Sequence, residues 1–168
     1  MALFQPTALF RGAEYITPEY LREHGIRALI LDVDNTLTGH GSQQLPPAIA
    51  AWLQTMKESG VKLRVASNNM PGRVRPFAQK IGLPYSALCC KPAPFGLWHA
   101  CREMGVRPCE AALVGDQVFT DAMGANLAGV RMLLVQPMYH DIKPLIRLRR
   151  HLEKPVLRRY YKKGGRLL

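Results

Sequence analysis

Two carboxylates at the end of one apolar run are the first residues whose chemistry stands out. Asp32 and Asp34 lie two positions apart at the end of residues 27–33, which read as a buried strand. Buried carboxylates are costly unless they are paired, and a divalent cation removes most of that cost. Taken alone, the segment fits either a metal site or a strand end with solvated acids.

Further polar residues follow the later apolar runs of the chain. They are Ser67 with Asn68, then Lys91, then Gly115-Asp116 with Asp121. Each of these alone also fits a turn, a solvated lysine or a helix cap. Taken in order, they supply a carboxylate nucleophile, a metal site and donors for phosphate oxygens. The set therefore predicts phosphoryl transfer.

The order of apolar runs and helical spacing predicts the elements that position these residues. Strands are expected at residues 27–33, 61–66, 85–90, 111–114 and 131–135. Helices are expected at residues 48–59, 73–81, 94–104 and 120–127. This alternation is typical of an α/β fold with a parallel sheet and helices on both faces. Such folds bind ligands at the carboxyl ends of their strands, where the polar residues fall.

These residues resemble the motifs of the haloacid dehalogenase (HAD) superfamily. Asp32-Val33-Asp34-Asn35-Thr36 is similar to its Asp-x-Asp-x-Thr motif, and the later polar residues look like its other three motifs. Residues 16–21, 34–37, 67–69, 91–92 and 115–121 further resemble the YqeG family of subclass IIIA phosphatases, which is related to mitochondrial phosphatidylglycerophosphate phosphatases. The resemblance implies a HAD-like Rossmannoid three-layer sandwich with a central parallel sheet.

The resemblance also implies catalytic roles for the carboxylates. Asp32 would attack phosphorus and form an aspartyl-phosphate. Asp34 would protonate the leaving alcohol and then activate the hydrolytic water. Magnesium would be held by Asp32, by the backbone carbonyl of Asp34 and by Asp116, which suits an ion that prefers oxygen ligands and keeps several waters.

The remaining motif residues would handle the phosphate and its charge. Ser67 and Asn68 would bind phosphate oxygens, and Lys91 would offset charge on the nucleophile and the phosphoryl group. Asp121 would orient Lys91 or a metal-bound water. Thr36 would support the nucleophile loop.

The gaps between motifs are too short for a cap domain, which many HAD enzymes insert there. Residues 37–66 hold a loop and one helix, and residues 68–90 hold one helix and one short strand. We therefore expect a capless domain at residues 1–140 with an open active site. An open site suits a phosphate on something large, such as a lipid headgroup, a nucleic acid or a protein, unless a neighbouring subunit supplies a lid.

The positive charge is concentrated in residues 141–168. This segment carries ten of the 23 lysines and arginines and two of the 12 acids, so it holds +8 of the formal charge of +11. Apolar residues recur between the cations at helical spacing: Leu145, Leu148, Leu152, Val156 and Tyr160. The pattern predicts a basic amphipathic helix that Pro155 breaks or kinks.

The basic helix has two compatible interpretations, packing on the same domain and attraction to an anionic membrane. Nucleic acid would also attract this charge, but the chain lacks an aromatic-rich readout module, so we expect none to bind. With the resemblance, the tail favours phosphatidylglycerophosphate as substrate. The alternatives are a phosphatase of a soluble sugar phosphate or nucleotide, or a HAD-scaffold partner of a GTPase or ribosome assembly factor.

Length and composition add weaker constraints. The chain has 168 residues, no apolar run of the roughly 18 residues that span a bilayer, and no secretory signal in residues 1–10. We expect a cytoplasmic protein, with peripheral contact at the inner face of the membrane as an option. Its oligomeric state is left open.

Two smaller groups of residues also invite a choice of interpretation. Arg73 and Arg75 fit a solvated helix face better than a contact with a substrate headgroup. The cysteines fit small buried apolar side chains better than a metal or redox site, since none form a Cys-x-x-Cys pair. They are Cys89, Cys90, Cys101 and Cys109.

Overall fold

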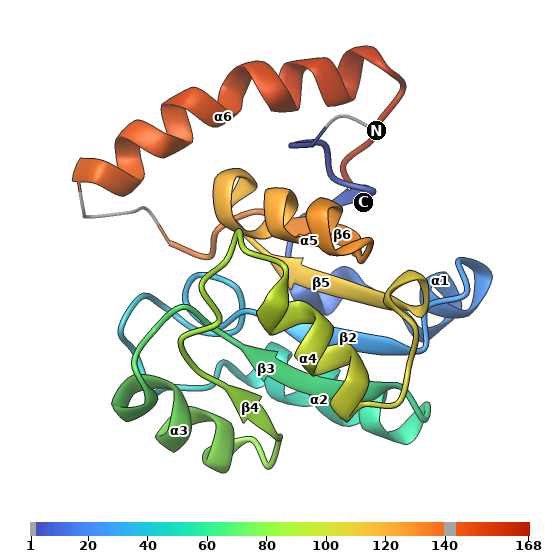
Figure 1. Ribbon diagram of the computed structural model, residues 1–168, viewed down its shortest axis with the longest axis vertical. Helices are drawn as coiled ribbons and strands as arrows, with labels where there is room; N and C mark the ends of the chain where they lie inside the picture. The colour runs from blue at the N-terminus through green and yellow to red at the C-terminus, as the bar shows by residue number, and fades with distance from the viewer. Residues whose placement is uncertain (1–2, 140–143) are drawn as a thin grey trace.

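A six-stranded parallel sheet forms the centre of the molecule (Figure 1). The computed structural model describes residues 3–139 and 144–168. The strands are β1 (Ala8–Phe10), β2 (Ala28–Leu31), β3 (Lys62–Ala66), β4 (Tyr85–Ser86), β5 (Ala111–Gly115) and β6 (Arg131–Val135). Their spatial order is β1-β6-β5-β2-β3-β4, and every neighbouring pair is parallel. Strand β2, which precedes the acid pair, therefore lies between β5 and β3.

Helices cover both faces of the sheet and make three layers. One face packs against α1 (Pro18–Glu23), α2 (Pro47–Glu58) and α3 (Pro71–Lys80), and the other against α4 (Phe95–Glu103), α5 (Met123–Ala128) and α6 (Pro144–Lys162). Successive side chains of a strand point to opposite faces. In β2, Leu29 and Leu31 join the first core, while Ala28 and Ile30 join the second. Burial on both faces explains the unbroken apolar run of this strand.

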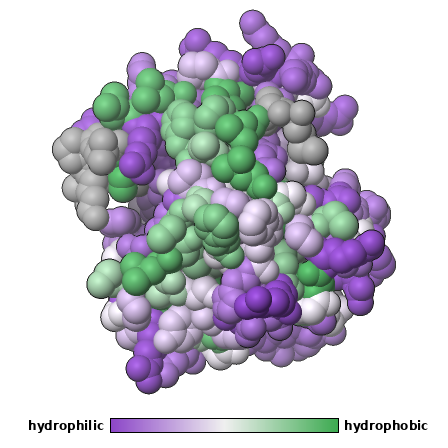
Figure 2. Space-filling model, viewed as in Figure 1, coloured by the Kyte–Doolittle hydropathy of each residue, from purple (hydrophilic) through white to green (hydrophobic). Residues whose placement is uncertain are grey.

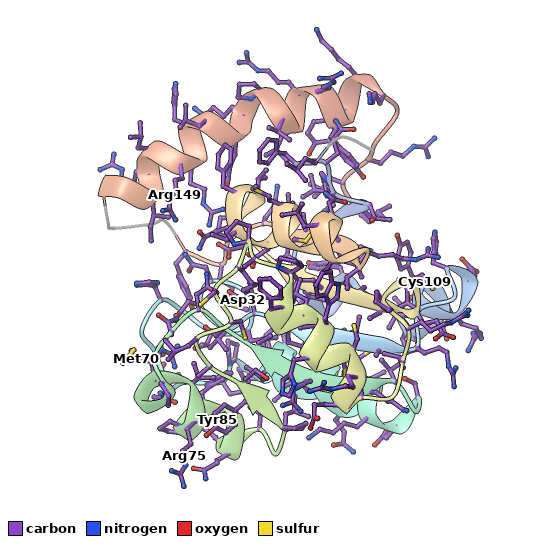
Figure 3. All side chains as sticks on the ribbon, viewed as in Figure 1. Asp32, Met70, Arg75, Tyr85, Cys109 and Arg149 are labelled. Atoms are coloured by element: carbon purple, nitrogen blue, oxygen red, sulfur yellow. The ribbon has the colours of Figure 1, made fainter. Side chains whose placement is uncertain are left out.

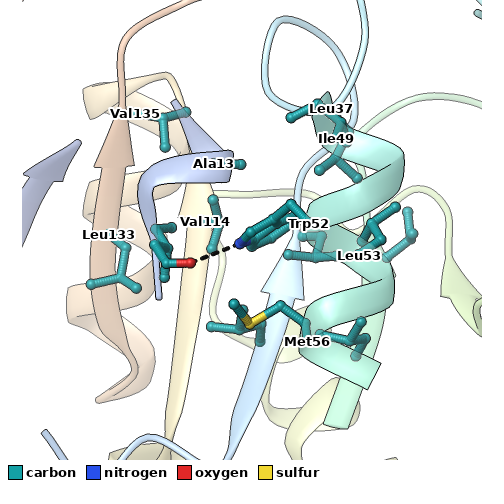
Figure 4. Packing of buried hydrophobic residues seen from close by; sticks show 14 of the residues in the cluster. Ala13, Leu37, Ile49, Trp52, Leu53, Met56, Val114, Leu133 and Val135 are labelled. Carbon is teal, nitrogen blue, oxygen red and sulfur yellow. Dashed lines mark hydrogen bonds between the residues drawn. The ribbon is translucent and has the colours of Figure 1, made fainter. Parts of the chain in front are cut away.

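Helix α2 fixes the far end of the loop that follows β2. Its buried residues are Ile49, Trp52, Leu53 and Met56, which form one stripe against the sheet (Figure 4). The indole Nε1 of Trp52 donates a hydrogen bond to the backbone oxygen of Ile16 at 2.8 Å. A buried indole needs such a partner. The loop with the acid pair is therefore held between a central strand and a well-packed helix.

The structure confirms most of the predicted elements and corrects two of them. The stretch 85–90 forms a strand only at Tyr85–Ser86, and the chain then turns with positive φ at Leu88 and Cys90. The helix expected at residues 120–127 is a π-helical turn, η3 (Val118–Ala122), followed by α5. Strand β1 and helix α1 were not predicted.

The C-terminal helix differs from its prediction in two ways. It runs through Pro155 without a break, one of the two expected effects of this proline, and Glu153 before the proline and Val156 after it pack against the domain. Val156 and Tyr160 pack toward the second core as expected, but Leu148 and Leu152 are 57% and 54% exposed. Residues 140–143 and the side chain of Leu145 lie outside what the structure describes. None of the helices in the described segments is both long and apolar enough to cross a bilayer.

The expectation of buried cysteines is half right. Cys89 and Cys101 are buried, and burial raises the pKa of both thiols, to about 11 for Cys101. Cys90 and Cys109 are exposed. All four lie outside the pocket described next.

Candidate active site

The predicted site residues converge on one pocket at the carboxyl ends of the strands. Its volume is about 180 Å³. The lining includes six of them: Asp32, Asp34, Ser67, Asn68, Lys91 and Asp121. Figure 3 shows Asp32 near the centre of the molecule, where the loops that follow the strands meet. The parallel sheet brings these residues together because each follows a strand at the same edge.

Lys91 binds two carboxylates in the floor of the pocket. Its Nζ lies 2.7 Å from Asp32 Oδ1 and 2.7 Å from Asp121 Oδ1, and its side chain is 2% exposed. Burial alone lowers the pKa of Lys91, but the carboxylates of Asp121 and Asp32 outweigh it and raise that pKa above its usual value. Burial raises the pKa of Asp32 to about 6, although Lys91 acts in the opposite direction. The lysine therefore carries a positive charge beside the proposed nucleophile.

Gly115 explains how Asp121 reaches Lys91. A Cβ atom at this position would lie 2.6 Å from Cγ of Asp121, which is too close for any other residue. The η3 turn carries Asp121, and its Oδ2 accepts a hydrogen bond from the backbone N–H of Gln117 at 3.1 Å. π-Helical turns are frequent at functional sites. The glycine of the Gly-Asp motif thus makes room for the second acid.

Three buried carboxylates form a group that fits a divalent cation. Asp32, Asp116 and Asp121 each offer an oxygen, and these oxygens lie within 4.8 Å of one another, the only such group in the described part of the chain. Asp116 Oδ1 is buried and has no hydrogen-bond partner among the described residues. Burial raises the pKa of Asp116 well above its usual value, Arg150 opposes this, and Asp121 and Asp32 add to it. Hard oxygen ligands and uncompensated charge suit Mg²⁺.

Asp34 is held by three donors beside the pocket. Its Oδ1 accepts hydrogen bonds from the backbone N–H of Gly41 at 2.8 Å and from Arg73 Nη2 at 2.7 Å. Its Oδ2 accepts one from Asn69 Nδ2. The Arg73 side chain is 17% exposed, so its interpretation as a solvated helix face was wrong. Arg75 is exposed, as that interpretation predicted.

The other motif residues take different positions. Ser67 is buried and lines the pocket, and its Oγ accepts a hydrogen bond from the backbone N–H of Asn69 at 3.3 Å. The Asn68 side chain holds the Lys91 backbone through two bonds, from Nδ2 to the carbonyl at 2.8 Å and from the Lys91 N–H to Oδ1 at 2.7 Å. That side chain therefore positions the lysine, and Asn68 also lines the pocket. Thr36 is buried in the loop that follows β2, outside the pocket lining.

Helix α6 contributes residues that the sequence did not assign to the site. Ile146 and Arg149 line the pocket together with His40, so α6 borders one side of the site. Figure 3 shows Arg149 on α6, above Asp32 in this view. Arg150 binds Asp116.

Comparison with known proteins assigns the chain to a family. The profile of haloacid dehalogenase-like hydrolases matches residues 39–129, a segment that begins after Asp32 and contains the other three motifs. The Bacillus subtilis (strain 168) protein named "Probable phosphatase YqeG" is 32% identical over 96% of this chain and 94% of its own length. The chain belongs to the haloacid dehalogenase-like hydrolase family. With these relatives, family membership makes it a phosphatase.

A more distant relative and a solved structure are also similar to this chain. The chloroplastic/mitochondrial phosphatidylglycerophosphate phosphatase 1 of Arabidopsis thaliana is 25% identical over 95% of this chain and 49% of its own length. An uncharacterized Listeria monocytogenes protein superposes with a TM-score of 0.58 at 18% identity, covering 71% of this chain and 85% of that protein. The structural likeness shows that the fold is shared.

Proposed function

We propose that this phosphatase hydrolyses phosphatidylglycerophosphate to phosphatidylglycerol and inorganic phosphate through an aspartyl-phosphate on Asp32. The observation that carries the reaction is the Asp32 carboxylate in the pocket, held at 2.7 Å by the buried Lys91. A carboxylate nucleophile needs nearby positive charge to approach an anionic phosphate. The charged lysine supplies it.

The reaction proceeds in two displacements at phosphorus. An Asp32 oxygen bonds to phosphorus, the bond to the leaving glycerol oxygen breaks, and Asp34 gives that oxygen its proton. A water molecule then attacks phosphorus, Asp34 takes its proton, and the acyl-phosphate bond breaks to release phosphate and the Asp32 carboxylate. Asp34 pairs with Arg73 before the reaction, so it must exchange this partner for a proton during the cycle.

The remaining groups stabilise charge on the transferred phosphoryl group. Asp32, Asp116 and the backbone carbonyl of Asp34 would hold Mg²⁺, which supplies charge neutralisation when bound. The Ser67 hydroxyl and the Lys91 ammonium line the pocket and would donate hydrogen bonds to phosphate oxygens. Asn68 and Asp121 keep the lysine in place.

The surface around the pocket supports a lipid substrate. Leu148 and Leu152 on α6 are more than half exposed among cations, and Met70 and Leu88, which follow β3 and β4, are 65% and 50% exposed at the same edge of the sheet. Figure 2 shows apolar surface over α5 and α6 and over the loop that leads into α4. Exposed leucines flanked by basic residues suit an anionic bilayer. We place the enzyme at the inner face of the membrane.

Arg149 supports the same substrate from inside the pocket. Phosphatidylglycerophosphate carries a phosphodiester in addition to its terminal phosphomonoester. A guanidinium in the pocket lining would bind this second anionic group while Lys91 faces the first. A soluble phosphomonoester is the second candidate, favoured by a pocket volume of about 180 Å³, which accommodates a small ester.

Phosphate release from vesicles distinguishes the two candidates. Vesicles of phosphatidylglycerophosphate in phosphatidylcholine would be compared, with Mg²⁺, with a panel of sugar phosphates and nucleotides. We expect faster release from the lipid, and a Leu148→Ser/Leu152→Ser variant should lower the ratio of vesicle activity to soluble activity. Release from soluble esters alone would support phosphatase activity but contradict the proposal that phosphatidylglycerophosphate is the substrate.

A further inference from the structure

The basic helix α6 is bonded directly to the proposed cation site. Arg150 Nη2 contacts Asp116 Oδ2, and its Nη1 contacts the backbone oxygen of Asp116. We propose that Arg150 is a positioning residue for Asp116, so that docking of α6 sets the affinity of the active site for its divalent cation. This inference rests on the proposed role of Asp116 as a ligand.

The two carboxylate oxygens of Asp116 have different surroundings. Oδ2 binds Arg150, whereas Oδ1 is buried with no hydrogen-bond partner among the described residues. The Asp116 side chain is 0% exposed. An oxygen that is buried and unpaired is costly unless a ligand takes it. Arg150 therefore fixes one oxygen and leaves the other for the cation, as outer partners of metal ligands commonly do.

Glu153 secures Arg150 and links α6 to a second part of the site. It is 4% exposed, and its Oε2 lies 3.1 Å from Arg150 Nη1. Its Oε1 accepts a hydrogen bond from the backbone N–H of Val118 at 2.8 Å. Val118 begins the η3 turn that carries Asp121. One helical turn of α6 thus braces two of the three segments that bring acids to the cation site, those of Asp116 and Asp121.

The charges of these groups agree with a brace that operates while the cation is bound. Among the described residues, five buried carboxylates lie with three cations that are ion-paired to them, and Arg149 also lines the pocket, so the carboxylates outnumber the cations by one. The carboxylates are Asp32, Asp34, Asp116, Asp121 and Glu153, and the ion-paired cations are Arg73, Lys91 and Arg150. Because Glu153 offsets Arg150, the guanidinium adds no net positive charge to the site.

Cation binding and helix docking are therefore coupled. Loss of an outer partner typically weakens metal binding about 10–100-fold. Coupling between two equilibria is reciprocal, so bound cation must in turn hold α6 against the domain. The C-terminal half of α6 remains anchored by Val156, Leu157 and Tyr160, which pack against the second core.

Titration calorimetry of the full chain with Mg²⁺ tests the brace without turnover. Arg150→Gln should weaken Mg²⁺ binding about 10–100-fold. The matched control is Arg158→Gln, which removes the same charge from an exposed position of the same helix and should leave the affinity unchanged. Glu153→Gln, whose amide oxygen still accepts the Val118 hydrogen bond, should fall between them and carries the test if Arg150→Gln does not fold.

Hydrogen exchange of α6 gives a second readout. Mg²⁺ should slow exchange of α6 amides in the wild type but not in Arg150→Gln. Unchanged Mg²⁺ affinity in Arg150→Gln and Glu153→Gln would overturn the brace, and tighter binding would show that Arg150 competes with the cation. A wild type that binds no Mg²⁺ would instead remove the proposed metal site, so the two failures are distinguishable.

Discussion

Lys91 and Arg150 each bind two buried carboxylates at or beside the same site, yet they come from different parts of the fold. Lys91 lies on a loop that follows a strand, and its side chain is 2% exposed between Asp32 and Asp121. Arg150 comes from a helix laid over the domain, and its side chain is 20% exposed. The sheet thus positions the proposed nucleophile Asp32, while helix α6 contacts the proposed cation ligand Asp116 and lines one side of the pocket.

Removing each cation should separate these two roles. Lys91→Met leaves Asp32 and Asp121 buried without their shared partner, which should cost about 3–5 kcal/mol of unfolding free energy. Arg150→Met should cost less, because solvent already reaches the guanidinium. Urea denaturation of the metal-free proteins measures both. Equal losses of stability, or a larger loss for Arg150→Met, would contradict the claim that Lys91 contributes more to stability than Arg150.

The raised pKa of Asp32 predicts how stability depends on pH. Burial raises this pKa from 3.8 to about 6, so between these values the folded state binds more protons than the unfolded state. Stability of the metal-free protein should therefore fall as pH rises from about 4 to 6, by on the order of 2–3 kcal/mol. Thermal melting across this range checks the sign.

Two additions sharpen the pH experiment. Mg²⁺ should restore stability at neutral pH, because it compensates the ionised carboxylates. Asp32→Asn should reduce the pH dependence, since the amide does not titrate, and leave the part that comes from the raised pKa of Asp116. If the metal-free wild type instead gains stability as pH rises over this range, the effect of Lys91 on the pKa of Asp32 must be larger than the effect of burial.

Arg149 should affect substrate binding more than the chemical step. Losing one charge-assisted hydrogen bond costs about 1.5–3 kcal/mol, which corresponds to an increase in KM of about 10–100-fold. We expect this from Arg149→Gln on a glycerol ester that carries a second phosphate, with kcat largely kept. Arg149→Lys should recover part of the affinity. A similar rise in KM for a plain monophosphate would mean that Arg149 binds the reacting phosphate instead.

The site residues that follow the strands could be predicted from sequence, because each lies directly after an apolar run that is visible in the local sequence. Asp32, Ser67, Lys91 and Asp116 each follow an apolar run, and parallel strands bring such positions to one edge. The three-residue edge strand β1 is too short to give a periodic signal. The same holds for the π-helical turn that places Asp121.

The contribution of α6 to the site could not be predicted, because it depends on contacts between residues far apart in the sequence. The apolar spacing of α6 indicated a buried stripe through Leu148 and Leu152, but these leucines are exposed and Glu153 is buried in their place. A buried glutamate is stable there only because Val118 and Arg150 bind it. The Arg73–Asp34 pair likewise joins residues 39 positions apart that no local pattern connects.

Trapping the covalent intermediate on Asp32 tests the central claim most directly. Protein quenched in acid during turnover of a ³²P-labelled substrate should carry label on the peptide that contains Asp32, and hydroxylamine should release it, as expected for an acyl-phosphate. Asp32→Asn should carry no label, and its turnover should fall on the order of 10⁴–10⁶-fold. Label elsewhere, or near-normal turnover by a folded Asp32→Asn protein, would contradict the account.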